Sequence, residues 1–252
     1  MNMTADLHVH TVASGHAYST ILEMAKAAKA RGLKVIAVTD HGPAMPGGPH
    51  PYYFGNLRSV PDTVGGVRIL RGVEANILDP SGSLDLGDAC LSGLDFVAAG
   101  IHPDTGYSGR NARDNTRAVV NAMQNPHVDM IVHPCSPGYP VDMEQLVMAA
   151  AHFGVILELN ARSFSPYMIG RRDSRELCTC MGRLARKHGV HVAVNSDAHF
   201  FTEVGVVDQA LAIARAADLT EEHIICANPV RLANFLEQRK TRLRTVPLHT
   251  AV

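Results

Sequence analysis

The sequence lacks tryptophan, has few other aromatic residues and carries almost no net charge. Its 252 residues include six tyrosines and seven phenylalanines, and 23 basic side chains are balanced by 24 acidic ones. Without an excess of positive charge, the chain has no global field that would attract nucleic acid or an anionic membrane. The scarcity of aromatic residues also argues against a stacking platform for single-stranded nucleic acid. We therefore expect any recognition of an anion to be local.

Long hydrophobic runs and paired cysteines are absent as well. No apolar run reaches the roughly 18 residues that a membrane-spanning helix needs. Residues 1–6 lack the basic and then apolar layout of a secretory signal peptide, so we expect a cytoplasmic protein with no membrane partner. The five cysteines are scattered and form no C-x-x-C pair, which favours reduced thiols over a disulfide framework.

The hydrophobic pattern alternates between short β-branched runs and longer segments of helical period. This alternation is typical of repeated βα units around a parallel sheet, and single α/β barrels commonly have roughly 200 to 250 residues. The expected strands are residues 5–10, 34–40, 67–74, 96–102, 128–133, 155–160 and 191–196. The expected helices are residues 19–31, 113–124, 142–153, 173–188 and 206–217, with two further helices at 220–225 and 229–238.

Two segments show no periodicity. Residues 42–55 are rich in proline and glycine, which predicts a loop, neither helix nor strand, over one end of the sheet. Residues 239–252 mix arginine and proline without a pattern, and we expect them to be a mobile tail. Because no shift in composition marks a boundary, residues 1–238 are expected to form one domain.

Histidines and carboxylates gather at the ends of the predicted strands. His8 and His10 end the first strand two residues apart, so their side chains point to the same face. In a parallel barrel all carboxyl ends of the strands open on one face, so residues far apart in sequence meet there. The side chains that we expect to meet are His8, His10, His16, His41, Glu74, His102, His133, Asp197 and His199.

This set predicts a metal centre. Burying seven imidazoles and two carboxylates without partners would be very costly, and metal ions remove that cost. Nine ligands exceed the three or four that one zinc ion takes, so two or three ions are expected, with at least one carboxylate bridging them. A site rich in histidine and free of thiolate suits zinc, manganese or iron.

The strand-end motifs follow one another in an order that is specific to one family. They are D-L-H-V-H-T at residues 6–11, V-T-D-H at 38–41, G-V-E at 72–74, A-G-I-H at 99–102, I-V-H-P at 131–134 and S-D-A-H at 196–199. In these motifs the chain resembles the PHP family, the polymerase and histidinol phosphatase superfamily. Within it, the T-D-H-G-P segment and the proline-rich loop that follows most resemble those of the YcdX-like phosphatases.

The resemblance implies a distorted seven-stranded (β/α)7 TIM-like barrel that holds three divalent metal ions. It implies that the first ion is bound by His8, His10, Glu74 and Asp197, the second by Glu74, His102 and His133, and the third by His16, His41 and His199. Glu74 would bridge the ions, and Glu74 and Asp197 would be catalytic by orienting the nucleophile. Phosphatases of this family use a metal-bound hydroxide, which agrees with the lowered pKa of a coordinated water. The expected activity is the hydrolysis of small-molecule phosphomonoesters.

Other functions remain open at this stage. A phosphodiesterase or exonuclease would use a similar centre, although the chain lacks a basic stripe and an appended nucleic-acid domain. An amidohydrolase barrel also begins with H-x-H, but it does not need His16, His41 and Glu74 in addition. A non-catalytic metal-binding module is expected to have lost a ligand, and none is lost. Cys180 and Arg186 have the C-x5-R spacing of cysteine phosphatases, but they fall in a predicted helix.

Substrate contacts are less sharply indicated than metal ligands. Arg162 follows the sixth predicted strand at the same mouth, and a guanidinium can pair with two phosphate oxygens. We therefore expect Arg162 to bind the phosphate of the substrate. Asn160 and Ser163, or Arg110 and Arg113 after the fourth strand, are alternatives.

Overall fold

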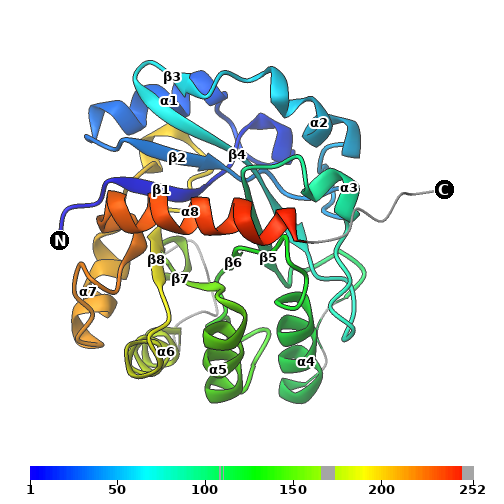
Figure 1. Ribbon diagram of the computed structural model, residues 1–252, viewed down its shortest axis with the longest axis vertical. Coiled ribbons are helices and arrows are strands. Elements are labelled where there is room, and N and C mark those ends of the chain that lie inside the picture. The colour runs from blue at the N-terminus through cyan, green and yellow to red at the C-terminus, as the bar shows by residue number, and fades with distance from the viewer. Residues whose placement is uncertain (108, 110, 166–173, 246–252) are drawn as a thin grey trace.

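Seven parallel strands form a nearly closed barrel in the computed structural model, which describes residues 1–107, 109, 111–165 and 174–245 (Figure 1). The strands follow the order β1-β2-β4-β5-β6-β7-β8, and β3 pairs with β4 in antiparallel orientation. Their bounds are β1 (Ala5–Val9), β2 (Val35–Val38), β3 (Thr63–Val64), β4 (Val67–Asn76), β5 (Phe96–Gly100), β6 (Met130–Ile131), β7 (Ile156–Asn160) and β8 (Val192–Asn195). The expected distorted (β/α)7 barrel is confirmed.

Helices surround this barrel and connect its strands. They are α1 (Ile21–Ala30), α2 (Pro51–Asn56), α3 (Asp88–Leu91), α4 (Ala112–Ala122), α5 (Met143–Phe153), α6 (Ser174–His188), α7 (Asp208–Ala216) and α8 (Pro229–Arg244). The first helix begins in a capping box, in which Thr20 accepts from the backbone N–H of Glu23 and Glu23 accepts from that of Thr20. Among the described residues, no helix is both long and apolar enough to cross a membrane.

The core is built from strands that are buried along both faces. Every residue of β1, β5, β7 and β8 is buried, as expected for parallel strands that are covered by helices outside and by each other inside. Leu7, Phe96, Ile131 and Leu157 are among the fully buried residues of the core. This rigid layer fixes the positions of the residues that follow each strand.

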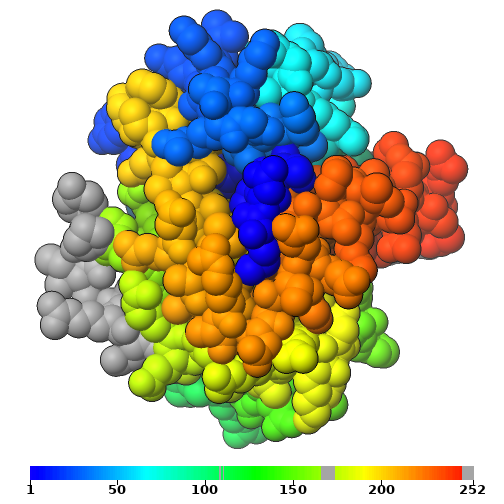
Figure 2. Space-filling view, turned by 90° about the vertical axis from the view of Figure 1, so that its left-hand side faces the viewer, coloured from blue at the N-terminus to red at the C-terminus, as the bar shows by residue number. Residues whose placement is uncertain are grey.

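The barrel closes between β1 and β8 without a regular ladder. The backbone N–H of Leu7 donates to Asn195 Oδ1 at 2.9 Å, and at the carboxyl end of β1 Val9 and Ala198 form an isolated parallel bridge. Lower down, the backbone N–H of Thr4 donates to the carbonyl oxygen of Cys226 at 2.8 Å. Figure 2 shows the first residues of the chain, in dark blue, beside the orange part of the surface that includes residues 220–227.

Residues 220–227, which lie beside the gap between β1 and β8, do not form the helix predicted at 220–225. Residues 221–223 form a turn, the backbone N–H of Val192 donates to His223 O at 3.0 Å, and Ile224 forms an isolated parallel bridge with Val192. A short 3-10 turn, Ile225–Ala227, follows. The loop predicted at 42–55 is also wrong in its last part, because α2 begins at Pro51, where His50 caps the helix and proline suits its first turn.

The predicted mobile tail is wrong for residues 239–244. Helix α8 continues to Arg244 and crosses the amino-terminal end of the barrel (Figure 1). Arg239 is buried there, and its Nε donates to Asp129 Oδ2 at 2.6 Å, just before β6. An ion pair in the interior therefore extends the helix beyond the point where its hydrophobic pattern ends. The rest of the predicted tail, 246–252, lies outside the described residues.

Candidate metal centre

The carboxyl ends of the barrel strands bring the predicted ligands together. His8 and His10 extend from β1 toward one point, with their Nε2 atoms 3.0 Å apart. His102 and His133 follow β5 and β6, and their Nε2 atoms lie 3.1 Å apart. His10 also lies beside His41 and His199, with ring centroids 4.5 and 4.3 Å away. The strand ends thus gather the imidazoles into one cluster.

Glu74 lies at the centre of this cluster. Its Oε1 is 2.9 Å from His102 Nε2 and 3.0 Å from His133 Nε2. Its Oε2 is 2.8 Å from His41 Nδ1, while the Nε2 atoms of His8 and His10 are 3.4 and 3.3 Å away. The carboxylate therefore faces five imidazoles from four strand ends, which is the position that a bridging ligand requires.

Asp197 follows β8 and lies beside the histidines of β1. Its Oδ1 is 3.2 Å from His10 Nε2 and 3.6 Å from His8 Nε2. Both Asp197 and His133 have positive φ angles, 55° and 33°, although neither is glycine. Strained backbone of this kind costs about 1–3 kcal/mol and is found mainly at functional sites. The strain here places two side chains of the cluster.

His16 forms the exposed edge of the cluster. Its ring centroid is 4.9 Å from that of His41 and 5.0 Å from that of His199. The side chain is solvent-exposed, whereas His133 is half-buried and the other seven predicted ligands are buried. All nine side chains are therefore brought to one mouth, with His16 at its rim.

The donor set fits divalent metal ions. Glu74 Oε2 and Asp197 Oδ1 are buried and make no well-aligned hydrogen bond among the described residues. Three groups have ligand atoms that all lie within 4.8 Å of one another; they are His8, His10 and Asp197; His41, Glu74 and His102; and His10, His41 and His199. Two unsatisfied carboxylate oxygens among imidazole nitrogens are what cations would complete.

The pKa values of the two carboxylates and of His102 are shifted in the direction that suits such ions, whereas, against burial, Glu158 raises the pKa of His8 and Glu74 raises that of His41. Burial would raise the pKa of Glu74, but His41, His102 and His8 beside it hold that pKa well below its usual range. The pKa of Asp197 is likewise held low against its burial, first by His8. Burial lowers the pKa of His102 to about 4 despite Glu74 nearby. Ionised carboxylates and neutral imidazole are the forms that bind metals.

Glu158, in the middle of β7, forms hydrogen bonds with two of the predicted ligands, His8 and His133. This supporting role was not predicted from the sequence. Its Oε1 accepts from His8 Nδ1 at 2.8 Å and its Oε2 from the backbone N–H of His133 at 2.8 Å. Asn160 and Asn195 donate to the same carboxylate at 3.0 and 2.9 Å. With Nδ1 of His8 bonded to a carboxylate, its Nε2 is left to face the cluster. The sequence feature that could have indicated this role is an acidic residue inside an otherwise apolar strand.

Asp40 supports the cluster from β2, through Ser14. It accepts from Ser14 Oγ at 2.7 Å, from the backbone N–H of Thr11 at 2.7 Å and from the Tyr53 hydroxyl at 2.6 Å. Ser14 Oγ lies 3.0 Å from His10 Nδ1. Because the serine proton goes to Asp40, the oxygen is left to accept from His10, which fixes the tautomer with Nε2 free. Asp40 lay in the T-D-H motif, but its role was not predicted.

Arg162 is placed at the mouth by an acidic partner. Its Nη1 donates to Glu203 Oε2 at 3.1 Å, and the same oxygen accepts from the backbone N–H of His199 at 3.0 Å. The guanidinium is thus tethered beside a predicted ligand and is partly exposed. Asn160 instead donates to Glu158 and, at 3.1 Å, to Asp197 Oδ2, so it supports the cluster. Of the remaining alternatives, Arg113 is exposed in the first turn of α4, and Arg110 lies outside the described residues.

The cysteine alternative finds no support in the described structure. Cys180 is exposed in the middle of α6, and Arg186 lies in the last turn of the same helix, so neither stands in a strand-to-helix loop. An exposed helical thiol lacks the cradle of backbone N–H groups that a cysteine phosphatase uses to hold phosphate.

Comparison with known proteins agrees with this arrangement. The profile of the family described as PHP domain matches residues 6–164. A protein of Caldanaerobacter subterraneus named as a probable phosphatase is 42% identical over 96% of this chain and 94% of its own length. A probable phosphatase of Acetivibrio thermocellus is 43% identical over 97% of this chain and 99% of its own.

A solved structure shares the fold at low sequence identity. It is histidinol phosphate phosphatase from Lactococcus lactis, complexed with zinc, L-histidinol and phosphate. That structure matches 86% of this chain and 95% of its own with a TM-score of 0.61 and 16% identity.

Proposed function

Because the chain belongs to the PHP domain family, we propose that it is a metal-dependent phosphatase that hydrolyses phosphomonoesters of small molecules. The observation that carries this proposal is the convergence of seven imidazoles and two carboxylates, seven of the nine buried, on one mouth of the barrel. The relatives named as probable phosphatases, which this chain matches over nearly its full length, support the same reaction class.

Three divalent ions would be held by this cluster. One would be bound by His8, His10, Glu74 and Asp197, one by Glu74, His102 and His133, and one by His16, His41 and His199. When bound, such ions lower the pKa of coordinated water toward about 7 and offset the charge of the phosphate oxygens. Zinc in the Lactococcus lactis structure supports zinc here, and manganese and iron suit the same donors.

The supporting residues would hold the ligands in place during turnover. Glu158 keeps His8 in one tautomer, and Ser14 with Asp40 does the same for His10. Arg162 would turn from Glu203 to the phosphate of the substrate, where its guanidinium can pair with two oxygens. Glu203 would keep that guanidinium at the mouth between turnovers.

Small substrates are favoured over nucleic acid. The net charge of the chain is −1, so no excess of positive charge is available to follow a phosphate backbone. Histidinol phosphate belongs among the candidates because the Lactococcus lactis protein holds L-histidinol and phosphate.

The test is phosphate release from a panel of monoesters, with one diester, by metal-loaded and chelator-treated protein. The panel includes sugar phosphates, nucleotides, histidinol phosphate, p-nitrophenyl phosphate and bis-p-nitrophenyl phosphate. We expect monoester turnover that disappears with the chelator and returns with zinc, manganese or iron. Turnover of the diester alone would replace this proposal with a phosphodiesterase, and a fully metal-loaded protein without any turnover would contradict it.

A further inference from the structure

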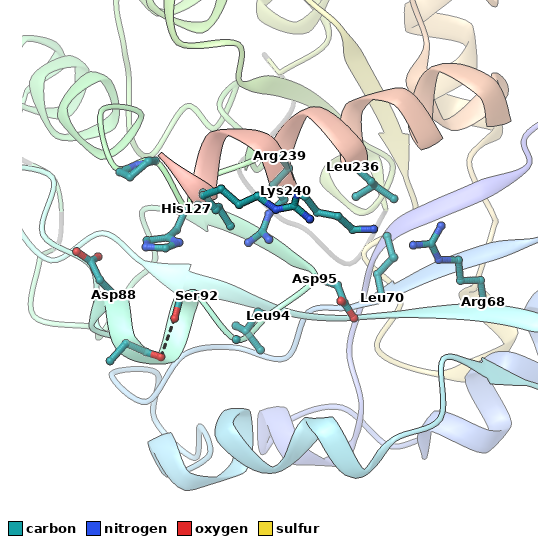
Figure 3. Close-up of a pocket in the computed structure, with 15 residues that line it drawn as sticks. Arg68, Leu70, Asp88, Ser92, Leu94, Asp95, His127, Leu236, Arg239 and Lys240 are labelled. Carbon is teal, nitrogen blue, oxygen red and sulfur yellow. Dashed lines mark hydrogen bonds between the residues drawn. The ribbon is translucent and has the colours of Figure 1, made fainter. Parts of the chain in front are cut away.

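A second cavity lies at the opposite end of the barrel from the metal centre. It has a volume of about 890 Å³ and lies between α8 and the beginnings of β4 and β5 (Figure 3). Leu70, Leu94 and Leu236 are buried residues that line it. Sites for small molecules typically enclose roughly 300–1,000 Å³ and are lined largely by apolar residues, with a few placed polar groups. The cavity has the size and the apolar lining of such a site.

The guanidinium of Arg239 is a buried charged group that lines the cavity, in a residue that is only 5% exposed. Asp129, beside it, already accepts three hydrogen bonds. It receives Arg239 Nε at 2.6 Å, Arg242 Nη2 at 2.7 Å and the backbone N–H of Val97 at 2.9 Å. Two guanidinium groups thus share one buried carboxylate, so one positive charge is left unbalanced.

Arg239 also has a donor to spare. Its Nη2 is buried and has no hydrogen-bond partner among the residues that the structure describes. His127, which is 4% exposed and lines the same cavity, likewise has a buried Nδ1 without a partner in the described part of the chain. Figure 3 shows both side chains in the space beneath α8. Leaving the charged donor of Arg239 buried and unpaired is costly, so an acceptor from outside the chain would stabilise it, and the ring of His127 offers a second polar contact.

The rim of the cavity adds to this positive charge. Arg68, Lys240 and Arg244 are exposed lining residues. Of the two acidic lining residues, Asp95 is already paired with Arg71 at 2.7 Å, and Asp88 is exposed. Lys240 shares its charge with Glu237 at 2.7 Å on the outer surface, where such pairs are weak. The cavity therefore suits an anion that also has an apolar part.

We propose that this cavity binds a small organic phosphate, with Arg239 and His127 holding the phosphate group and the three leucines contacting its apolar part. A phosphate offers several acceptor oxygens and up to two negative charges, which matches the spare donors and the unbalanced charge. The site is separate from the metal centre, because Arg68 and Leu70 begin β4 whereas Glu74 lies near its end. Binding here would not require turnover.

The probe is phenylphosphonate, whose carbon–phosphorus bond a phosphatase does not hydrolyse, titrated calorimetrically into the metal-loaded protein. Arg239→Lys keeps a positive charge for Asp129 but removes the spare donor, and we expect the affinity at the cavity to fall about tenfold or more. Arg68→Gln, at the exposed rim, should fold normally and weaken the same binding by a smaller factor. Lys26→Gln, an exposed residue of α1, removes the same charge far from the cavity and should bind as the wild type does.

Two further titrations distinguish binding in this cavity from binding at the metal centre and test whether the ligand needs an apolar part. Asp197→Asn should leave the cavity binding unchanged, and inorganic phosphate should bind there more weakly than phenylphosphonate because it cannot contact the leucines. The proposal is overturned if Arg239→Lys and Arg68→Gln both bind like the wild type, or if Asp197→Asn abolishes all binding. Equal affinities for inorganic phosphate and phenylphosphonate would overturn the proposal that the ligand has an apolar part in contact with the leucines.

Discussion

The two ends of the barrel both bury charge, but they leave opposite kinds of atoms unsatisfied. At the carboxyl end, Glu74 Oε2 and Asp197 Oδ1 are acceptors without well-aligned donors in the described structure. At the amino end, Arg239 Nη2 and Arg242 Nε are donors without acceptors among the same residues. The first arrangement can be completed by cations and the second by an anion.

This contrast indicates that the residues of the carboxyl end serve the reaction, whereas the buried ion pairs of the amino end stabilise the fold. At the mouth, one ring nitrogen of an imidazole is hydrogen-bonded to a supporting residue, as His8 Nδ1 is to Glu158, so that the lone pair of the other ring nitrogen faces the cluster. At the other end, Asp129 is used entirely within the protein to hold α8 against the strands. We therefore expect substitutions at the mouth to change reaction rate and metal binding, and substitutions at the opposite end to change the free energy of unfolding.

The largest effect is expected from Asp197→Asn. The amide keeps the shape but removes a charged ligand, so monoester turnover should fall by about a thousandfold or more, because bound metal supplies several kcal/mol of transition-state stabilisation. Asp218→Asn, an exposed aspartate, is the matched control and should turn over normally. Wild-type turnover in Asp197→Asn would remove this residue from the reaction.

Asp129→Asn tests the opposite end. Removing the charge that two buried arginine contacts share should lower the free energy of unfolding by about 3 kcal/mol, because an ion pair broken on one side leaves uncompensated charge. Denaturant unfolding measures the loss. Turnover per metal-loaded, folded molecule should stay close to that of the wild type, and a loss of turnover in fully folded protein would contradict the division between the two ends.

Glu158→Gln sharpens the contrast within the mouth. The amide no longer fixes the tautomer of His8 by a charged hydrogen bond, so we expect metal affinity to fall about 10- to 100-fold, as is typical for partners of metal-bound histidine. Competition with a chelator of known affinity measures this change. The exposed Glu222→Gln serves as the control. If both variants retain wild-type affinity, Glu158 has only a packing role.

Gly100→Ala should produce the smallest effect of the series. A Cβ at this position would lie 2.6 Å from Val132 Cγ2 and 3.1 Å from His133 Cε1, so these side chains must shift. We expect a loss of about 1 kcal/mol in stability together with weaker metal binding. At Gly55, in α2, an added Cβ meets nothing within 4 Å, and Gly55→Ala should be neutral or slightly stabilising. Identical behaviour of the two variants would show that His133 has room to move.

The part of this arrangement that could be predicted is the part that periodicity controls. Side chains alternate along a strand and parallel strands end on one face, so the approach of His8, His10 and the other strand-end residues follows from their positions. The β strands are also short, apolar and bounded by turns, which made the barrel predictable. The resemblance to the PHP family, now confirmed by its profile, named the fold.

What could not be predicted depends on contacts between distant segments. Glu158 is a single acidic residue in β7, and only the packing of β1 against that strand shows that it supports His8. Arg239 follows no apolar pattern, yet its pairing with Asp129 continues α8 to Arg244. Residues 220–225 have helical composition, but beside β8 they form a turn that ends in a single bridge between Ile224 and Val192. In each case a tertiary interaction outweighs local preference.

The central claim is that the acceptor-rich mouth is completed by metal ions. The most direct measurement is a crystal structure of the metal-loaded protein with anomalous difference maps recorded at the metal absorption edges. We expect peaks between the imidazoles and the oxygens of Glu74 and Asp197, three in total, and none in Asp197→Asn at the position that Asp197 contacts. A cluster without any peak at saturating ion concentration, with Glu74 still hydrogen-bonded to His102, would contradict the account.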